Sequence, residues 1–126
     1  MIDVSIVIVS YNTKEFLKKC LFSLRENVKN LSYEIIVVDN ASSDGTAEEI
    51  KNIEIIKNEK NLGFSKANNI GVKRAKGRYL LFLNPDTVVY RGTLETLVKF
   101  MDENKDAGAS TCKVIMPNGK IDDATH

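Results

Sequence analysis

The stretch Ile35-Ile36-Val37-Val38-Asp39-Asn40 places four apolar residues directly before two polar ones. Segments 6–12 and 79–86 show the same abrupt change, from an apolar run to small polar or acidic residues. Short apolar runs that alternate with helical patterns are typical of buried parallel strands. In an open parallel sheet the ligand binds outside the carboxyl ends of the strands. We therefore expect the polar residues after these runs to share one cleft, with Asp39 and Asp86 as the first candidates.

The composition is that of one globular domain. The chain has 126 residues, 43% of them apolar, and 18 basic residues against 17 acidic ones leave a formal charge of +1. This balance disfavours a nucleic-acid binder. No apolar stretch approaches the roughly 18 residues of a membrane span, and Met1-Ile2-Asp3 lacks the basic start of a signal peptide. Cys20 and Cys112 are too few and too far apart for a disulfide framework or a zinc site, so we expect two buried thiols in a cytoplasmic protein.

Alternating strand and helix patterns fill the chain. Strands are expected at 4–10, 34–39, 53–57, 79–83 and 109–116. Helices are expected after residue 13, near 47–51, over 63–76 and from about residue 92 onward. This alternation predicts an α/β fold, with a doubly wound, mostly parallel sheet and helices on both of its faces.

Three local signals predict where elements begin and end. Asn12 or Thr13 is expected to cap the first helix, with Glu15 reaching back in a capping box. Gly77 is expected to end the helix over 63–76 in a left-handed conformation. Pro117-Asn118-Gly119 predicts a turn after the last strand.

Taken singly, the candidate site residues are more typical of turns and caps than of ligand contacts. Their functional groups are nevertheless suited to binding a ligand. A carboxylate at Asp39 can accept an N–H from a heterocyclic base, and Asp86 is a hard oxygen ligand suited to Mg²⁺ or Mn²⁺. Segment 61–65 precedes a helix whose N-terminus would attract an anion, with Lys66 and Asn68 in its first turns. The sequence has no P-loop, no catalytic Ser/His/Asp pattern and no Cys/His metal motif.

Four blocks carry a resemblance to a known family: Val4–Asn12, Ile36–Thr46, Asn61–Gly71 and Gly77–Asp86. In this order and spacing they resemble the nucleotide-binding half of family 2 inverting glycosyltransferases, which have the Rossmann-like GT-A fold. The resemblance implies transfer of a sugar from a dTDP- or UDP-linked donor to an acceptor hydroxyl with inversion. It also implies a place in cell-surface polysaccharide or glycoconjugate synthesis, with a saccharide or lipid-linked saccharide as acceptor.

The resemblance implies roles for individual residues. Ser10, Tyr11 and Asn12 would border the nucleoside, and Asp39 would contact the pyrimidine base. Asp86 matches the last acid of the family's Asp-x-Asp motif, which holds Mg²⁺ or Mn²⁺ on the diphosphate. The other implied donor-binding residues are Asn61, Gly63, Lys66, Asn68 and Asn84.

The sequence departs from the family pattern in two positions and in length. Asn84 replaces the first acid of Asp-x-Asp, and Asn68 stands where many members have arginine. Both departures resemble the branch that transfers rhamnose and related deoxysugars, so a dTDP-linked donor is expected. Members continue well beyond this length, so residues 1–126 are expected to be the donor-binding portion of a protein in the cytoplasm or at the inner face of the membrane. The acceptor site and the catalytic base would lie beyond residue 126, and the isolated chain is expected to be inactive in transfer.

Three other interpretations compete with this one. A non-catalytic nucleotide-sugar-binding module, or an inactive fragment, is the strongest, and donor binding without turnover would favour it. A Rossmann oxidoreductase is disfavoured because Ser10-Tyr11-Asn12-Thr13 replaces a glycine-rich loop after the first strand. A phospho-receiver domain is weaker still, because the acidic pair after the first strand is missing.

Overall fold

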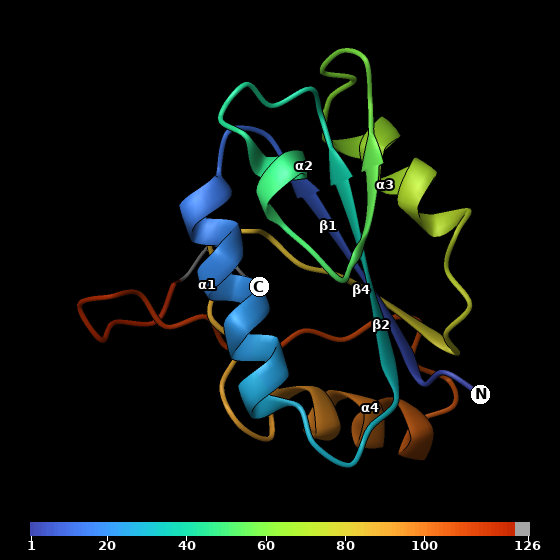
Figure 1. Ribbon diagram of the computed structural model, residues 1–126. Coiled ribbons are helices and arrows are strands. Elements are labelled where there is room, and N and C mark those ends of the chain that lie inside the picture. Colours follow the sequence, from blue (N-terminus) through green and yellow to red (C-terminus); the bar gives the residue numbers. More distant parts are fainter. Residues whose placement is uncertain (123–126) are drawn as a thin grey trace.

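A four-stranded parallel sheet forms the centre of the computed structural model, which describes residues 1–122 (Figure 1). Its strands are β1 (Val4–Ser10), β2 (Tyr33–Asp39), β3 (Glu54–Lys57) and β4 (Tyr79–Phe82). They lie in the order β3-β2-β1-β4, and all three neighbouring pairs are parallel. The chain therefore builds outward from β1 to β3 and then returns to the other side of β1, so the direction of winding reverses between β1 and β4.

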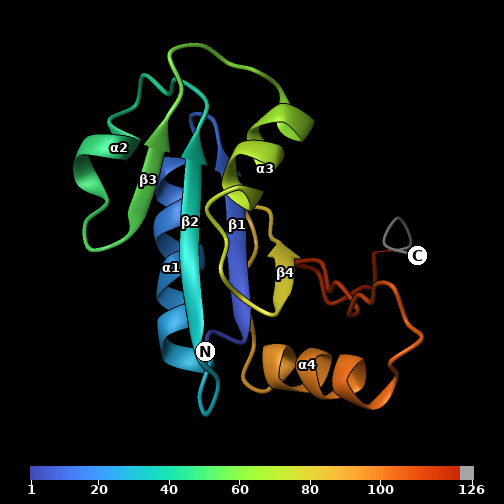
Figure 2. The same ribbon diagram turned by 90° about the vertical axis from the view of Figure 1, so that its right-hand side faces the viewer.

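Helices cover both faces of the sheet, as expected (Figure 2). The helices are α1 (Lys14–Asn27), α2 (Thr46–Glu49), α3 (Phe64–Val72) and α4 (Thr93–Glu103). α1 and α4 contribute to the larger apolar cluster on one face, and α3 packs on the smaller cluster of the other. Within residues 1–122, no helix is long and apolar enough to cross a bilayer.

Burial of β1 on both faces explains why its sequence is a continuous apolar run. Ile6 and Ile8 belong to the cluster beneath α1, whereas Val7 belongs to the cluster beneath α3. All three side chains are fully buried. Each contributes about 1.5–3 kcal/mol relative to an exposed position, so burial holds β1 firmly from both faces.

β4 is covered on one face only. Leu81 and Tyr79 pack against the larger cluster, but Leu80 and Phe82 are 44% and 51% exposed. Strand β4 also pairs only with β1 among the described residues. The α3 side of β4 is therefore an open apolar edge of the sheet.

Two expectations about the chain near β4 are wrong. Gly77 does not have a positive φ and does not end a helix; α3 ends earlier, at Val72. A Cβ at Gly77 would lie only 2.6 Å from the backbone nitrogen of Ser5, so glycine is needed here for a close approach to β1. The Gly77 N–H also donates to Ser5 Oγ at 2.8 Å.

Segment 109–116, expected to be a strand, is not part of the sheet. Its only strand-like feature is one antiparallel bridge between Ile115 and Ile121. The turn between them does form, with the Gly119 N–H donating to the Met116 carbonyl at 2.8 Å. Cys112 in this segment is exposed, which contradicts the expected burial, whereas Cys20 is buried.

Candidate functional site

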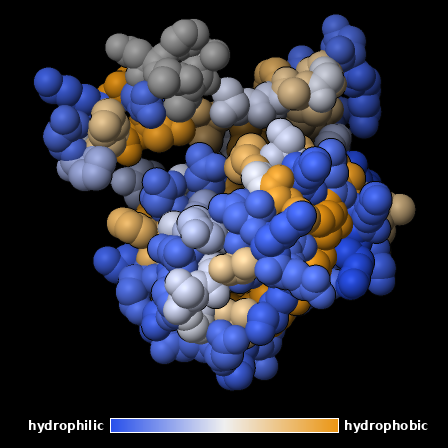
Figure 3. Space-filling model, turned by 90° about the horizontal axis from the view of Figure 1, so that it is seen from above, coloured by the Kyte–Doolittle hydropathy of each residue, from blue (hydrophilic) through white to orange (hydrophobic). Residues whose placement is uncertain are grey.

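The carboxyl ends of β1 and β2 meet at one edge of the sheet. Ser10 and Asp39 are partners in the parallel register, and the Asn40 N–H donates to the Ser10 carbonyl at 2.9 Å. The winding of the sheet reverses between β1 and β4, and open α/β sheets bind ligands at the carboxyl ends of the strands beside such a reversal. Seen from above, this end of the molecule is largely hydrophilic, with fewer apolar groups among the polar ones (Figure 3).

Asp39 holds its carboxylate in a fixed orientation at the end of β2. The residue is only 2% exposed, and both of its carboxylate oxygens accept a hydrogen bond from Ser42. The distances are 2.6 Å from Ser42 Oγ to Oδ1 and 3.0 Å from Ser42 N to Oδ2. Within residues 1–122 no lysine or arginine forms an ion pair with it. Because an ionised carboxylate has about four acceptor positions, Asp39 can still accept an N–H from a ligand.

Hydrogen bonds join the loop after β1 to the loop after β2. The Asn12 N–H donates to Ser42 Oγ at 2.9 Å, and the Ser43 N–H donates to Asn12 Oδ1 at 2.8 Å. Asn12 has a φ of 51°, in the left-handed region, which aims its side chain at the neighbouring loop. Tyr11, the residue before it, is 50% exposed at the same edge.

Asp44 caps both helices that follow these loops. Its Oδ2 accepts the N–H of Lys14 at 3.0 Å, and its Oδ1 accepts the N–H of Thr46 at 3.1 Å and the Thr46 hydroxyl. Burial alone would raise the pKa of Asp44, but these hydrogen bonds outweigh it and lower the pKa below its usual value. The expected capping box is wrong, because Thr13 at the N-cap makes no side-chain cap. Its hydroxyl bonds instead with Ser10 Oγ at 2.8 Å.

Asn40 ties the loop before α3 to the end of β2. Its Nδ2 donates to the Gly63 carbonyl at 3.2 Å, and its Oδ1 accepts the N–H of Leu62 at 3.3 Å. Asn61 Oδ1 accepts the Gly63 N–H at 2.9 Å, so Asn61 shapes this loop as well. Gly63 has a φ of +85°, a conformation that favours glycine over any residue with a side chain.

The first turns of α3 place their two candidate side chains differently. Lys66 is exposed and points away from the packed side of the helix, within reach of an anion at the helix N-terminus. Asn68 is 8% exposed and lies on the buried side with Ala67 and Gly71. Of the two, Lys66 is therefore the more accessible to a ligand.

Asn84 and Asp86 lie on the far side of β1 from Asp39, in the connection that follows β4. The Asn84 carbonyl accepts the Thr87 hydroxyl at 2.7 Å and lies 3.9 Å from the Cys20 sulfur of α1. Burial raises the pKa of the Cys20 thiol, and the Asp86 charge raises it further. The structure thus joins Ser10, Asn12 and Asp39 through hydrogen bonds, whereas Asn84 and Asp86 follow β4 on the other side of β1.

The side chains available near Asp86 limit what kind of metal site is possible. Asp86 is exposed and is the only carboxylate in its turn, next to the amide of Asn84. Residues 1–122 contain no group of three His, Cys, Asp or Glu side chains that could hold a metal. Mg²⁺ commonly takes one or two protein carboxylates together with substrate phosphates. Asp86 therefore fits an ion shared with a bound diphosphate, and not an ion held by protein ligands alone.

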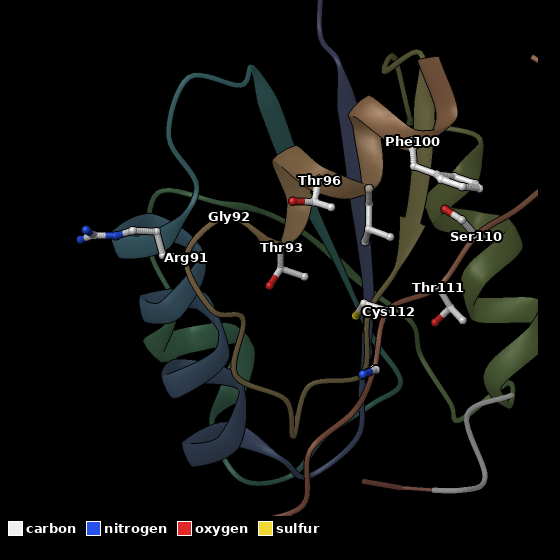
Figure 4. A pocket seen from close by; sticks show the side chains of 10 residues that line it. Arg91, Gly92, Thr93, Thr96, Phe100, Ser110, Thr111 and Cys112 are labelled. Atoms are coloured by element: carbon white, nitrogen blue, oxygen red, sulfur yellow. The ribbon is translucent and has the colours of Figure 1, made fainter. Parts of the chain in front are cut away.

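A hollow of about 530 Å³ lies away from this edge, between α4 and segment 110–113 (Figure 4). Thr93, Thr96 and Phe100 line it from the helix, and Cys112 lines it from the segment. α4 is bound at the amino ends of the strands, where Asp102 accepts hydrogen bonds from Arg78 and from Tyr79. None of the candidate site residues lines this hollow.

Sequence reasoning missed Ser42, Asn40 and the hydrogen bond that the Lys14 N–H donates to Asp44. The small polar residues 41–46 are typical of a turn, which the structure has there. The sequence did not indicate which groups Ser42 and Asn40 bind, because their partners Asn12 and Gly63 are distant in sequence.

Comparisons with known proteins give a consistent result. The family model described as Glycosyl transferase family 2 matches residues 5–123. The minor teichoic acid biosynthesis protein GgaB of Bacillus subtilis (strain 168) is 31% identical over 112 residues, which are 82% of this chain and 12% of GgaB. The poly(ribitol-phosphate) beta-N-acetylglucosaminyltransferase TarS of Staphylococcus aureus (strain Mu50 / ATCC 700699) is 28% identical over 112 residues, 82% of this chain and 20% of TarS.

The crystal structure of S. aureus TarS 1-349 is similar to this chain with a TM-score of 0.74 and 27% identity. The match covers 82% of this chain and 33% of that one. The chain spans about one fifth or less of the two curated relatives named above.

Proposed function

Because the chain belongs to glycosyl transferase family 2, we propose that it forms the donor-binding part of an enzyme that transfers a sugar from a nucleotide-diphospho-sugar to an acceptor hydroxyl. The observation that carries this proposal is the buried, oriented carboxylate of Asp39 at the carboxyl end of β2. The names of GgaB and TarS support a role in the synthesis of a cell-surface polymer.

Recognition of the base is assigned to Asp39. Uracil and thymine each present an N–H that this carboxylate can accept, and cytosine lacks that N–H. A base without it would leave the buried charge unpaired, at a cost of about 1–3 kcal/mol. The half-exposed ring of Tyr11 at the same edge is placed to border the nucleoside.

Asp39 does not choose between uracil and thymine, so the donor is proposed to be UDP- or dTDP-linked. The thymine methyl contributes only about 1 kcal/mol in an apolar pocket. Asn84 and Asn68 resemble the deoxysugar-transferring branch and favour a dTDP-linked donor. The name of TarS instead favours an N-acetylglucosamine donor.

The diphosphate is assigned to two parts of this edge of the sheet, the N-terminus of α3 and the turn after β4. The N-terminus of α3, with Gly63 and the exposed ammonium of Lys66, supplies positive charge for it. Asp86, with Asn84 beside it, would hold Mg²⁺ or Mn²⁺. That ion would neutralise charge on the leaving nucleoside diphosphate.

Transfer with inversion is a single displacement at the anomeric carbon, which needs a base to deprotonate the acceptor hydroxyl. The resemblance assigns no residue of the 126 to that base. Donor binding is therefore the activity proposed for this chain itself. A non-catalytic binding module stays the alternative, and slow hydrolysis of a bound donor by the chain would argue against it.

Calorimetric titration of the chain with UDP, dTDP and CDP, with and without Mn²⁺, tests the proposal. UDP and dTDP should bind more tightly than CDP. Asp39→Ala should weaken UDP binding about 5- to 150-fold, the equivalent of 1–3 kcal/mol. Asp106→Ala, an exposed carboxylate near the end of α4, is the matched control and should change nothing. Equal affinity of the wild type and Asp39→Ala for UDP would contradict the proposal.

A further inference from the structure

We infer that Ser42 is a positioning residue that sets base recognition by holding the Asp39 carboxylate. This inference rests on the proposed function, because it assumes that Asp39 contacts the base. Ser42 itself would not touch the nucleotide. Its effect on binding would pass through Asp39.

The first observation is that Ser42 donates a hydrogen bond to each oxygen of the Asp39 carboxylate. In the part of the chain that the structure describes, the carboxylate receives two hydrogen bonds, and Ser42 supplies both. One comes from its hydroxyl and one from its backbone N–H. Removing the hydroxyl would leave Oδ1 of a buried charge without that donor, and the side chain could then rotate about its remaining bond.

The second observation concerns the direction of the hydroxyl proton. Asn12 offers a backbone N–H to Ser42 Oγ, and an N–H can only donate. The single proton of Ser42 is therefore free to point at the Asp39 carboxylate, whose oxygen accepts it. The resulting chain runs from Asn12 N–H through the Ser42 hydroxyl to the carboxylate, and each bond polarises the next.

The third observation is backbone strain in the two loops that Ser42 joins. Asn12 and Ala41 have φ values of 51° and 63°, in the left-handed region that residues with side chains rarely adopt. The Ala41 conformation turns the chain so that Ser42 faces back toward Asp39. Such residues persist only where the surrounding contacts over-determine them, and the Ser42 hydrogen bonds are contacts of that kind.

The diphosphate half of the site is held differently. Asn40 binds the loop before α3 through Gly63 and Leu62, and none of these contacts involves Ser42. Loss of the Ser42 hydroxyl should therefore impair discrimination between bases while the α3 N-terminus stays in place. Loss of a residue that merely supported the fold would instead weaken binding of the base and binding of the diphosphate together.

The first test compares nucleotide binding by Ser42→Ala, Ser43→Ala and Ser42→Thr. Ser42→Ala should bind UDP about tenfold more weakly than the wild type, and its UDP-to-CDP affinity ratio should move toward one. Ser43→Ala is the matched control, because the strong contact of Ser43 is its backbone N–H, which the substitution keeps. Ser42→Thr retains the hydroxyl and should restore most of the affinity and the ratio. An unchanged ratio in Ser42→Ala would overturn the inference.

A double-mutant cycle with Asp39→Ala tests whether Ser42 acts through Asp39. In the Asp39→Ala background, Ser42→Ala should cause no further loss of UDP affinity. Independent, additive losses would overturn the inference. If Ser42→Ala does not fold, Ser42→Cys replaces it, because a thiol of similar shape is a weak donor and should give the same loss.

Amide hydrogen exchange of the ligand-free chain separates this inference from the proposed function. The Asn12 amide should exchange faster in Ser42→Ala than in the wild type or in Ser43→Ala, and unchanged protection would overturn the inference without any nucleotide. If the wild type binds no nucleotide, the proposed function fails and the inference fails with it. If Asp39→Ala weakens UDP binding but Ser42→Ala does not, only the inference fails.

Discussion

Gly71→Ala should destabilise the protein even though alanine is the better helix former. A Cβ at Gly71 of α3 would lie 2.5 Å from Cγ1 of Val7 and 3.2 Å from Cγ2 of Val38. Both valines are fully buried in the sheet. Ordinary carbon contacts are about 3.5–4.0 Å, so α3 must move away by roughly 1 Å or Val7 must leave its rotamer.

The size of the effect follows from two opposing terms. Overpacking of this severity costs up to about 3 kcal/mol, whereas replacing glycine by alanine inside a helix gains about 1 kcal/mol. The free energy of unfolding should therefore fall by about 2 kcal/mol. For a domain of this size the melting temperature should fall by roughly 6–8 °C.

Urea unfolding followed by circular dichroism measures this change. Gly108→Ala is the matched control, because no atom lies within 4 Å of its added Cβ and its φ is not positive. Val7→Ala removes the methyl groups that Gly71→Ala would strike, so the double variant should lose less stability than the two single losses combined. A Gly71→Ala protein as stable as the wild type, or additive losses in the double variant, would refute the reasoning.

Three further predictions concern other residues. Asp86→Ala should abolish any strengthening of UDP binding by Mn²⁺ and leave metal-free binding unchanged; calorimetry that shows the same Mn²⁺ effect in both proteins would contradict it. Asp44→Asn should lower the free energy of unfolding by about 1–2 kcal/mol at pH 7, because Asp44 uses both carboxylate oxygens as acceptors and an amide keeps only one. The folded-state pKa of Asp44 is lowered from 3.8, so its contribution is present above that pH and lost as the pH falls through the folded-state pKa. Urea midpoints of the two proteins should therefore converge in acid. With a thiol reagent at neutral pH, Cys112 should react in the native protein and Cys20 only after unfolding, since Cys20 is buried with a raised pKa.

The elements that were predicted well are those whose signal is local. β1 and β2 are buried on both faces, so their sequences are unbroken apolar runs that end where the strands end. The helix after β1 was placed correctly, with Thr13 at its N-cap position, because its apolar residues recur at helical spacing, but the Thr13 side chain does not make the capping hydrogen bond. The cap comes from Asp44, which lies 30 residues beyond the Lys14 amide that it accepts.

The failures share a physical cause, which is that the deciding contact is distant in sequence. Gly77 resembles a helix stop, but what requires glycine there is the backbone of Ser5. Segment 109–116 has the composition of a strand, yet a strand needs a neighbour, and within the described residues it has only the single bridge at Ile115. For the site, the sequence indicated which side chains have suitable chemistry, but not that Ser42 would link Asp39 to Asn12.

The sheet order β3-β2-β1-β4 also has a consequence for how the chain folds. Val4 pairs with Tyr33 on one side of β1 and with Tyr79 on the other, so the second pairing closes a loop more than twice as long. The entropy of loop closure alone makes the pairing of β1 with β4 about 1 kcal/mol less favourable than the pairing of β1 with β2. We expect β1, α1 and β2 to assemble first, both because their contacts are more local and because they leave the ribosome first. The hydrogen-bonded loops around Asp39 would then form before β4 has docked, and the turn that carries Asp86 would be added last.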